Sequence, residues 1–319
     1  MKMSSDEHNP SGAAPVRVRT GDLSENAPEV VSSAAGGSHE PQLPEEQLTE
    51  TRVPRVTPVV PQIRAASDDD LRVPWGWHEV LLFVVLGVIG SIAITWGLAQ
   101  IAVRGFGINS DEMFGTTMST AKSVVVLISQ AVIDAGAILY LYLMVLGRTP
   151  APFWPTIGWR GLGSGAGSVR ATAVQFLSGG AVLAIVVTFA GAFFNSKENL
   201  PIEELLKARV SVMLFAILGV VVAPLVEETI FRGFLYPVIA RRLGVSAGIG
   251  VTGTLFGLMH AAQLWGGWGQ IALLIMVGVI LTWVRARTGT VTASYFVHLG
   301  YNGLQLVGYL VYIISGFHH

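Results

Sequence analysis

The chain has 319 residues, of which 51% are hydrophobic and 13% are charged, against about 25% charged in an ordinary soluble domain. This composition predicts an integral membrane protein. The formal net charge of -1 and the lack of any basic block argue against general affinity for nucleic acid. The absence of cysteine excludes thiol catalysis, disulfide bonds and cysteine-ligated zinc.

Residues 1–74 differ from the rest of the chain, because Pro, Ser, Glu, Ala and Gly are frequent and no periodic apolar pattern is present. Such a segment cannot bury enough apolar surface to offset the entropy lost on ordering, so we expect a disordered tail. Its polar start lacks the apolar region of a signal peptide, and the first apolar segment is therefore expected to remain as a signal anchor. Residues 75–319 are expected to form the membrane domain.

Seven windows are long enough to cross about 30 Å of hydrocarbon. They lie at residues 78–103, 124–146, 171–194, 211–238, 247–264, 269–284 and 290–314. An exposed strand edge has no water to bond to in lipid, so all seven are expected to be helices. The predicted fold is an all-α, polytopic membrane helix bundle with about 7–8 transmembrane helices. The expected number of helices is seven or eight because the last window contains Gly303 and Gly308, where it could divide into two helices.

Basic residues near the window ends predict that the tail is cytoplasmic. Lys and Arg favour the cytoplasmic side, and with the tail inside nine of them lie on the inner side and five on the outer side. The inner set is Arg64, Arg72, Arg148, Arg160, Arg170, Arg241, Arg242, Arg285 and Arg287, and the outer set is Arg104, Lys122, Lys197, Lys207 and Arg209. We therefore expect an integral protein of the plasma or inner membrane.

Polar side chains interrupt the windows in the second half of the chain. Glu227 and Glu228 lie inside an apolar stretch, where each charge costs a few kcal/mol, so an adjacent pair indicates function. At a rise of about 1.5 Å per residue, Glu227, His260 and His298 each lie about 17–22 Å from the cytoplasmic end of their helix. Three separate helices thus place polar groups at a similar depth.

Arg232 follows Glu228 by four residues, so the two side chains share one helix face. Arg232 can hold Glu228 ionised and leave Glu227 about 100° round the helix, facing a cavity. A carboxylate and an imidazole that converge in a partly dry pocket can share a water and remove its proton. Glu227 and His260 are therefore candidates for general-base catalysis.

His298 and Asn302 are also four residues apart and share a helix face. An imidazole and a carboxamide supply two donors, which suits the oxyanion formed when a water attacks an amide carbonyl. Asp134, in the second window, is a further intramembrane acid with no motif around it. Two interpretations stay open for Asp134: a buried, hydrogen-bonded residue and a residue that lines a cavity.

Three motifs in this region resemble those of the CPBP intramembrane proteases, the group of CAAX prenyl endopeptidases and Abi-like, bacteriocin-processing proteins. Residues 227–232 resemble the family's Glu-Glu-x-x-x-Arg motif, residues 256–260 its Phe-x-x-x-His motif, and residues 298–302 its His-x-x-x-Asn/Asp motif. All three occur in the family's order. The resemblance covers the region 120–300 and is strongest over the core motifs, residues 220–303.

This resemblance implies an intramembrane endopeptidase that hydrolyses a membrane-associated peptide or protein substrate within the lipid bilayer. It assigns water activation to Glu227 and His260, support of the site to Glu228 and Arg232, and stabilisation of the tetrahedral intermediate to His298 and Asn302. No cofactor is favoured. If a divalent metal such as zinc is present, its ligands would be Glu227, His260 and His298.

Two other functions stay open. A proton-coupled membrane transporter would use the intramembrane Glu, His and Arg side chains as a relay, although the two halves show no internal repeat of the kind that many carriers have. A catalytically silent member of the same family would act as a scaffold or immunity protein, and the intact motifs argue against this.

Overall fold

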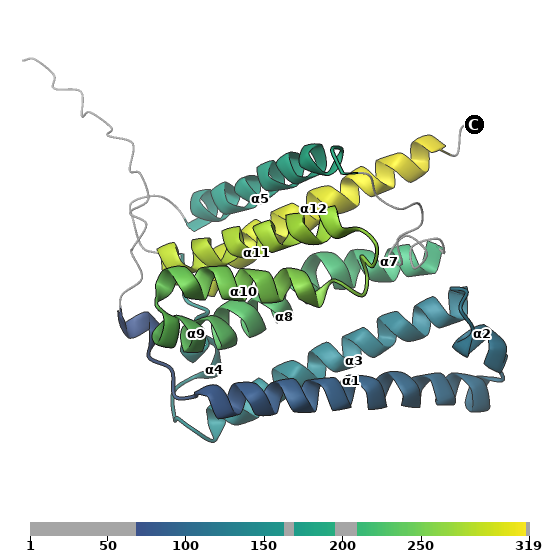
Figure 1. Cartoon of the computed structure of the whole chain (residues 1–319), viewed down its shortest axis with the longest axis horizontal. Coiled ribbons are helices and arrows are strands. Elements are labelled where there is room, and N and C mark those ends of the chain that lie inside the picture. The colour runs from purple at the N-terminus through teal and green to yellow at the C-terminus, as the bar shows by residue number, and fades with distance from the viewer. Residues whose placement is uncertain (1–67, 163–168, 195–208, 317–319) are drawn as a thin grey trace, which may run out of the picture. The chain divides into compact units, whose positions relative to one another are not determined.

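The computed structural model describes residues 68–162, 169–194 and 209–316, all of which lie in the unit Thr57–His319 (Figure 1). Residues 1–67 of the expected tail lie outside the described residues, as do the basic residues Arg64, Lys197 and Lys207. Within the described ranges every regular element is a helix, and no strand occurs.

The helices follow one another along the chain in four groups. The 3-10 helix η1 (Asp68–Leu71) precedes α1 (Trp77–Phe106), α2 (Ser110–Phe114) and α3 (Thr120–Leu146). The short α4 (Phe153–Thr156) leads to α5 (Val169–Gly191). One continuous stretch comprises α7 (Arg209–Ile217), the π-helix η2 (Leu218–Val222), α8 (Ala223–Glu228), the π-helix η3 (Thr229–Leu235) and α9 (Tyr236–Leu243). The last helices are α10 (Val245–Met259), α11 (Trp268–Thr288) and α12 (Val291–Gly316).

Among the described residues, five helical stretches are long and apolar enough to cross a membrane, which confirms the predicted all-α membrane fold. They are Trp77–Phe106, Thr120–Leu146, Thr172–Gly191, Val212–Leu243 and Trp268–Thr288, in five of the seven predicted windows. The window 247–264 instead holds α10, which has 15 residues and ends at Met259. The last window holds α12, a single helix of 26 residues whose apolar run is interrupted by His298 and Asn302.

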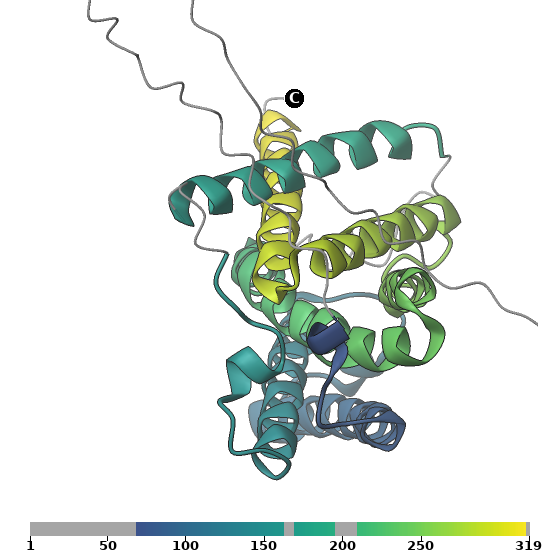
Figure 2. The same cartoon turned by 90° about the vertical axis from the view of Figure 1, so that its left-hand side faces the viewer.

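The stretch from α7 to α9 lies between two groups of helices (Figures 1 and 2). On one side α1 packs against α3, and on the other side α5, α10, α11 and α12 pack together. Since α8 contacts both α3 and α12, it passes through the interior of the described bundle. Polar residues on α8 can therefore be kept from the lipid, which is where intramembrane charges are tolerated.

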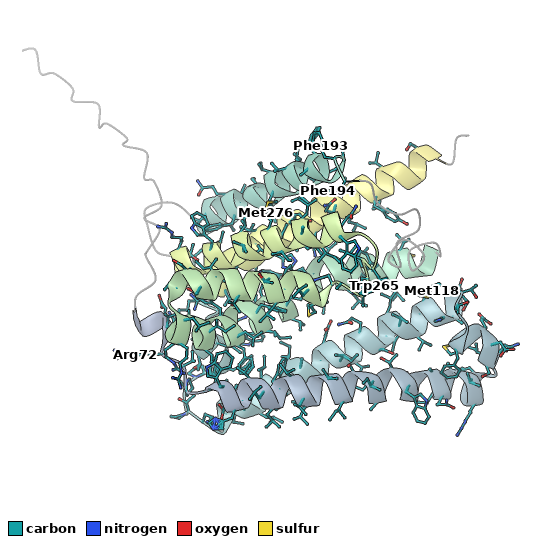
Figure 3. The ribbon with its side chains drawn as sticks, viewed as in Figure 1. Arg72, Met118, Phe193, Phe194, Trp265 and Met276 are labelled. Atoms are coloured by element: carbon teal, nitrogen blue, oxygen red, sulfur yellow. The ribbon has the colours of Figure 1, made fainter. Side chains whose placement is uncertain are left out.

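Apolar side chains project from α1 along its length (Figure 3). Leu81, Val85, Ile89 and Ile92 are each more than half exposed. Exposed apolar surface of this extent marks an interface with lipid or with another apolar body. Together with the five apolar helices, it identifies an integral membrane protein.

Small residues allow the helices around the site to approach closely. α5 and α12 meet at Gly180 and Gly300, and α10 and α11 meet at Gly253 and Gly278. At each of these four positions an added Cβ would collide with the backbone of the partner helix. Such contacts are typical of membrane helix pairs, where close packing replaces the hydrophobic effect. They fix the register of α10 and α12, which carry two of the three motifs.

Contacts with the bundle begin before residue 75, the predicted start of the membrane domain. Asp70 and Leu71 of η1 are buried, Asp70 forms an ion pair with Arg160, and Leu71 packs against Tyr236 and Ala240. These side chains find partners that are distant in sequence, Arg160 in the connection between α4 and α5 and Tyr236 and Ala240 on α9.

Candidate active site

Three elements from different parts of the chain carry the candidate residues. Glu227 and Glu228 end α8, where the main chain passes into η3. His260 directly follows α10 as its C-terminal cap, rather than lying inside a helix as expected. His298 lies in the first half of α12. The structure brings Glu227, His260 and His298 together, as their common depth predicted.

Glu227 lies between two imidazole rings. Its Oε1 atom is 3.8 Å from His260 Nε2, and its Oε2 atom is 3.7 Å from His298 Nε2. Both distances exceed a direct hydrogen bond and suit a bridging water. The Glu227 and His260 side chains are 17% and 18% exposed, so water can reach both.

Each imidazole is oriented through its Nδ1 atom. His260 Nδ1 lies 3.0 Å from the Phe256 carbonyl oxygen, which only accepts hydrogen bonds, so this nitrogen carries a hydrogen. His298 Nδ1 lies 3.0 Å from Glu228 Oε1, and an ionised carboxylate is likewise only an acceptor. Both rings therefore turn Nε2 towards Glu227, where it accepts when the ring is neutral and donates when the ring is protonated.

Glu228 and Arg232 form the fully buried ion pair that their spacing predicted, with 2.9 Å between Arg232 Nη1 and Glu228 Oε1. Arg232 also donates from Nη2 to the Gly278 carbonyl at 2.9 Å and from Nε to Thr282 Oγ1 at 3.3 Å. Its guanidinium lies 4.5 Å from the centre of the Phe256 ring. Because charges removed from water need such partners, Arg232 keeps Glu228 ionised and in place for His298.

The partners of Arg232 on α11, Gly278 and Thr282, were not predicted from the sequence. A main-chain carbonyl leaves no signature in a sequence, and a threonine in an apolar helix is common. Ser294 was also missed. Its side chain lies beside Glu228, although its hydroxyl donates to the Val291 carbonyl at 3.0 Å, and Glu228 Oε2 has no hydrogen-bond partner among the described residues.

Asn302 lies one turn beyond His298 on α12, and its Nδ2 donates to the Gly219 carbonyl in η2 at 2.8 Å. One of its two N–H groups is therefore bound to the main chain of the helix that carries Glu227. No hydrogen bond joins Asn302 to Glu227, His260 or His298 among the described residues.

Asp134 of α3 is buried and accepts a hydrogen bond of 2.8 Å from Gln130 Nε2. It lies close enough to Glu227 for the two carboxylates to repel each other. These contacts favour the interpretation of Asp134 as a buried, hydrogen-bonded residue at the edge of the site.

In the described part of the chain, no group of three or more His, Asp or Glu side chains meets the geometry of a metal site. Ligand atoms around a tetrahedral zinc lie about 3.3 Å apart, given bonds of about 2.0–2.1 Å. The nitrogen-to-oxygen distances of 3.7 and 3.8 Å around Glu227 are longer.

A family model described as Type II CAAX prenyl endopeptidase Rce1-like matches residues 209–304. The matched segment contains all three motifs, from Glu227 to Asn302, and is consistent with the resemblance to the CPBP intramembrane proteases. It covers less than a third of the chain and leaves α1, α3 and α5 outside. Neither the curated proteins nor the solved structures gave a match to the chain.

Proposed function

We propose that this chain, whose residues 209–304 match the Rce1-like CAAX endopeptidase family model, is an intramembrane endopeptidase acting on a membrane-associated peptide or protein. The observation that carries the proposal is the position of Glu227 between His260 and His298, at distances that admit a water. If the two acids served only to form a structural ion pair with Arg232, one acid would be enough. Glu228 already forms that ion pair, so Glu227 is not needed for it.

In the first step, a water held by Glu227 and His260 loses a proton to Glu227 while its oxygen attacks the carbon of the scissile peptide bond. His260 suits this role because its Nδ1–H is held by Phe256 and its Nε2 lone pair faces the water. In the second step, the proton passes to the amide nitrogen as the C–N bond breaks. The products are a carboxylic acid and an amine, so the reaction consumes one water.

The tetrahedral intermediate carries a negative oxygen that needs donors fixed in advance. Protonated His298 can donate from Nε2, because its Nδ1–H is engaged by Glu228 and the ring cannot turn away. Asn302 can donate the N–H that is not bound to Gly219. Thus Glu228 and Arg232 support the site without touching the substrate.

No step of this mechanism requires a metal. The substrate is expected to approach from the membrane, where an apolar groove of about 400 Å³ lies between α3 and α7 and is lined by residues such as Leu127, Ala131, Leu214 and Leu218. Such a groove fits an apolar chain better than a polar peptide. We further propose that the enzyme resides in the plasma or inner membrane with its N-terminal tail in the cytoplasm.

The test compares the purified protein with its Glu227→Gln and His260→Ala variants in liposomes, using a farnesylated CAAX peptide and a pool of membrane peptides from the host cell as probes. Wild-type protein should release peptide fragments, and both variants should release none while keeping their helical content. Glu112→Gln is a matched control, because Glu112 is an exposed acid on α2. Equal cleavage by wild type and both variants would reject the mechanism.

A parallel measurement separates the enzyme from a transporter. If the intramembrane acids form a proton relay, wild-type liposomes should show proton flux under an imposed pH gradient, and Glu227→Gln should lower that flux. The proposed protease should show no flux above empty liposomes.

A further inference from the structure

The helix that carries Glu227 and Glu228 is irregular on both sides of these residues. The π-helix η2 precedes α8 and the π-helix η3 follows it. Segments of π-helix are rare and are often found at functional sites. Each one rotates the residues that precede it about the helix axis, relative to the residues that follow it. The direction in which Glu227 and Glu228 point therefore depends on both π segments being kept.

The first π segment is held by Asn302. In π geometry a carbonyl pairs with the N–H five residues later, and Leu218 does so with Ala223. Gly219 would pair in the same way with Pro224, which has no N–H. The Asn302 side chain supplies the missing donor from α12.

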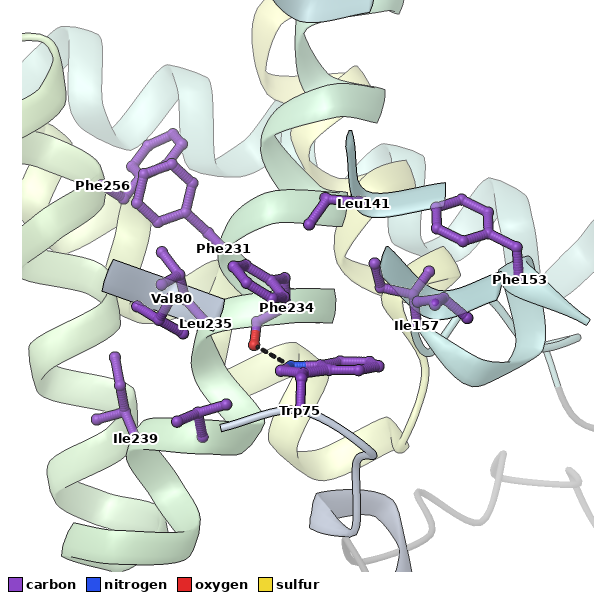
Figure 4. Close-up of a cluster of buried hydrophobic side chains, with 12 residues drawn as sticks. Trp75, Val80, Leu141, Phe153, Ile157, Phe231, Phe234, Leu235, Ile239 and Phe256 are labelled. Atoms are coloured by element: carbon purple, nitrogen blue, oxygen red, sulfur yellow. Dashed lines mark hydrogen bonds between the residues drawn. The ribbon is translucent and has the colours of Figure 1, made fainter. Parts of the chain in front are cut away.

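A second donor from a distant part of the chain reaches η3. The indole Nε1–H of Trp75 donates to the Phe234 carbonyl at 3.1 Å, and this bond is buried (Figure 4). Trp75 is 3% exposed, and its ring lies 5.8 Å from the Phe234 ring. Phe234 is two residues beyond Arg232, so Trp75 contacts the π segment that carries the partner of Glu228.

The backbone around Trp75 is held in return by the same helix. Arg241 of α9 donates from Nη2 to the Trp75 carbonyl at 3.1 Å and from Nη1 to the Val73 carbonyl at 3.3 Å. Upstream, Asp70 pairs with Arg160. The segment 70–75 is thus attached at several points, one of which is the bond from the Trp75 indole to the main chain of η3.

We propose that Trp75 is a positioning residue for the catalytic helix: its N–H stabilises the π geometry of η3 and so sets the direction of Glu227 and Glu228. The inference rests on the proposed function, which requires Glu227 to face His260 and His298 and requires Glu228 to contact His298. If η3 relaxed to a regular α-helix, the residues before it would turn by about 100° and shift by about 1.5 Å relative to α9. Glu228 would then lose its contact with His298 Nδ1.

The experiment compares Trp75→Phe, which keeps an aromatic ring and removes the N–H, with two controls. Trp77→Phe makes the same change at a partly exposed tryptophan two residues later. Asp70→Asn weakens the upstream attachment without touching the Phe234 carbonyl. If Trp75→Phe does not fold, replacement of Trp75 by 3-benzothienylalanine, which keeps the shape of indole and lacks only the N–H, takes its place.

Two readouts are measured on detergent-purified protein. One is the NMR signal of the ¹³C-labelled imidazole of His298, assigned with a His298→Gln variant, and it needs no substrate. The other is kcat and KM for the farnesylated CAAX peptide. Trp75→Phe is expected to shift the His298 signal and to lower kcat about tenfold or more, as for loss of a buried hydrogen bond, with KM within about twofold of wild type. Both controls should match wild type in both readouts.

A His298 signal and a kcat that are unchanged in folded Trp75→Phe would overturn the proposal. So would equal losses of kcat in Trp75→Phe and Asp70→Asn, because they would show that general stability and not the Phe234 bond is responsible. If wild type cleaves neither the farnesylated CAAX peptide nor the pool of membrane peptides, the proposed protease function fails, and the His298 signal alone then decides whether Trp75 sets the geometry of the site.

Discussion

The buried ion pair between Glu228 and Arg232 makes a strong prediction about stability. Arg232→Met removes the guanidinium and retains an apolar side chain of similar length. Glu228 would then be left as a charge with no exposed surface and only the His298 Nδ1–H as a donor. The Gly278 carbonyl would still accept the Thr282 hydroxyl at 2.7 Å, so the main penalty comes from Glu228.

The size of that penalty follows from burial. Breaking a buried ion pair by removing one partner costs about 3–5 kcal/mol, whereas removing both partners together costs much less. We expect Arg232→Met to lower the free energy of unfolding by about 4 kcal/mol, and the double variant with Glu228→Gln to recover about half of that loss. Arg148→Met is the control, because Arg148 pairs with Glu79 but is 46% exposed, and its loss should cost at most about 1 kcal/mol.

Reversible unfolding in mixed detergent micelles, followed by circular dichroism, would measure these free energies. The reasoning is refuted if Arg232→Met costs no more than Arg148→Met, or if the Arg232→Met and Glu228→Gln effects simply add. Either result would mean that water reaches the pair or that Glu228 is neutral before the substitution.

Further predictions concern the site and the helix contacts. Chelation with 1,10-phenanthroline, followed by desalting, should leave peptide cleavage unchanged, and activity that is lost and then restored by zinc would disprove the metal-independent mechanism. Asn302→Ala should lower kcat about 10²–10³-fold, as for loss of an oxyanion donor, whereas Gln305→Ala, one turn away, should change it less than about threefold. Gly180→Val should destabilise the protein in the unfolding assay because its Cβ would collide with the Val297 carbonyl, while Gly179→Val, which has no atom within 4 Å of an added Cβ, should be tolerated.

The sequence predicted several parts of this arrangement for clear physical reasons. Long apolar windows predicted α1, α3, α5 and α11, because hydrocarbon admits only segments whose backbone hydrogen bonds are internal. The four-residue spacing of Glu228 and Arg232 predicted their ion pair, since helix geometry alone fixes that contact. Comparable distances from the helix ends predicted that Glu227, His260 and His298 would meet.

Other parts depended on contacts between elements that are far apart in the chain. No local pattern indicates that the segment 70–75 packs on α9, that Asn302 bonds to Gly219, or that Trp75 bonds to Phe234. The acceptors in both hydrogen bonds are main-chain carbonyls, which every residue possesses, so side-chain identity gives no sign of which carbonyl will be used.

Amino-acid type and spacing by themselves determined which segments enter the membrane and which ionisable side chains lie at one depth, because both follow from hydropathy and helical rise. Tertiary packing alone decided which atoms face each other at that depth. The two π segments change the rotation of the helix before and after Glu227, and a main-chain carbonyl in each accepts a hydrogen bond from a side chain that is distant in sequence, Asn302 on α12 and Trp75 before α1.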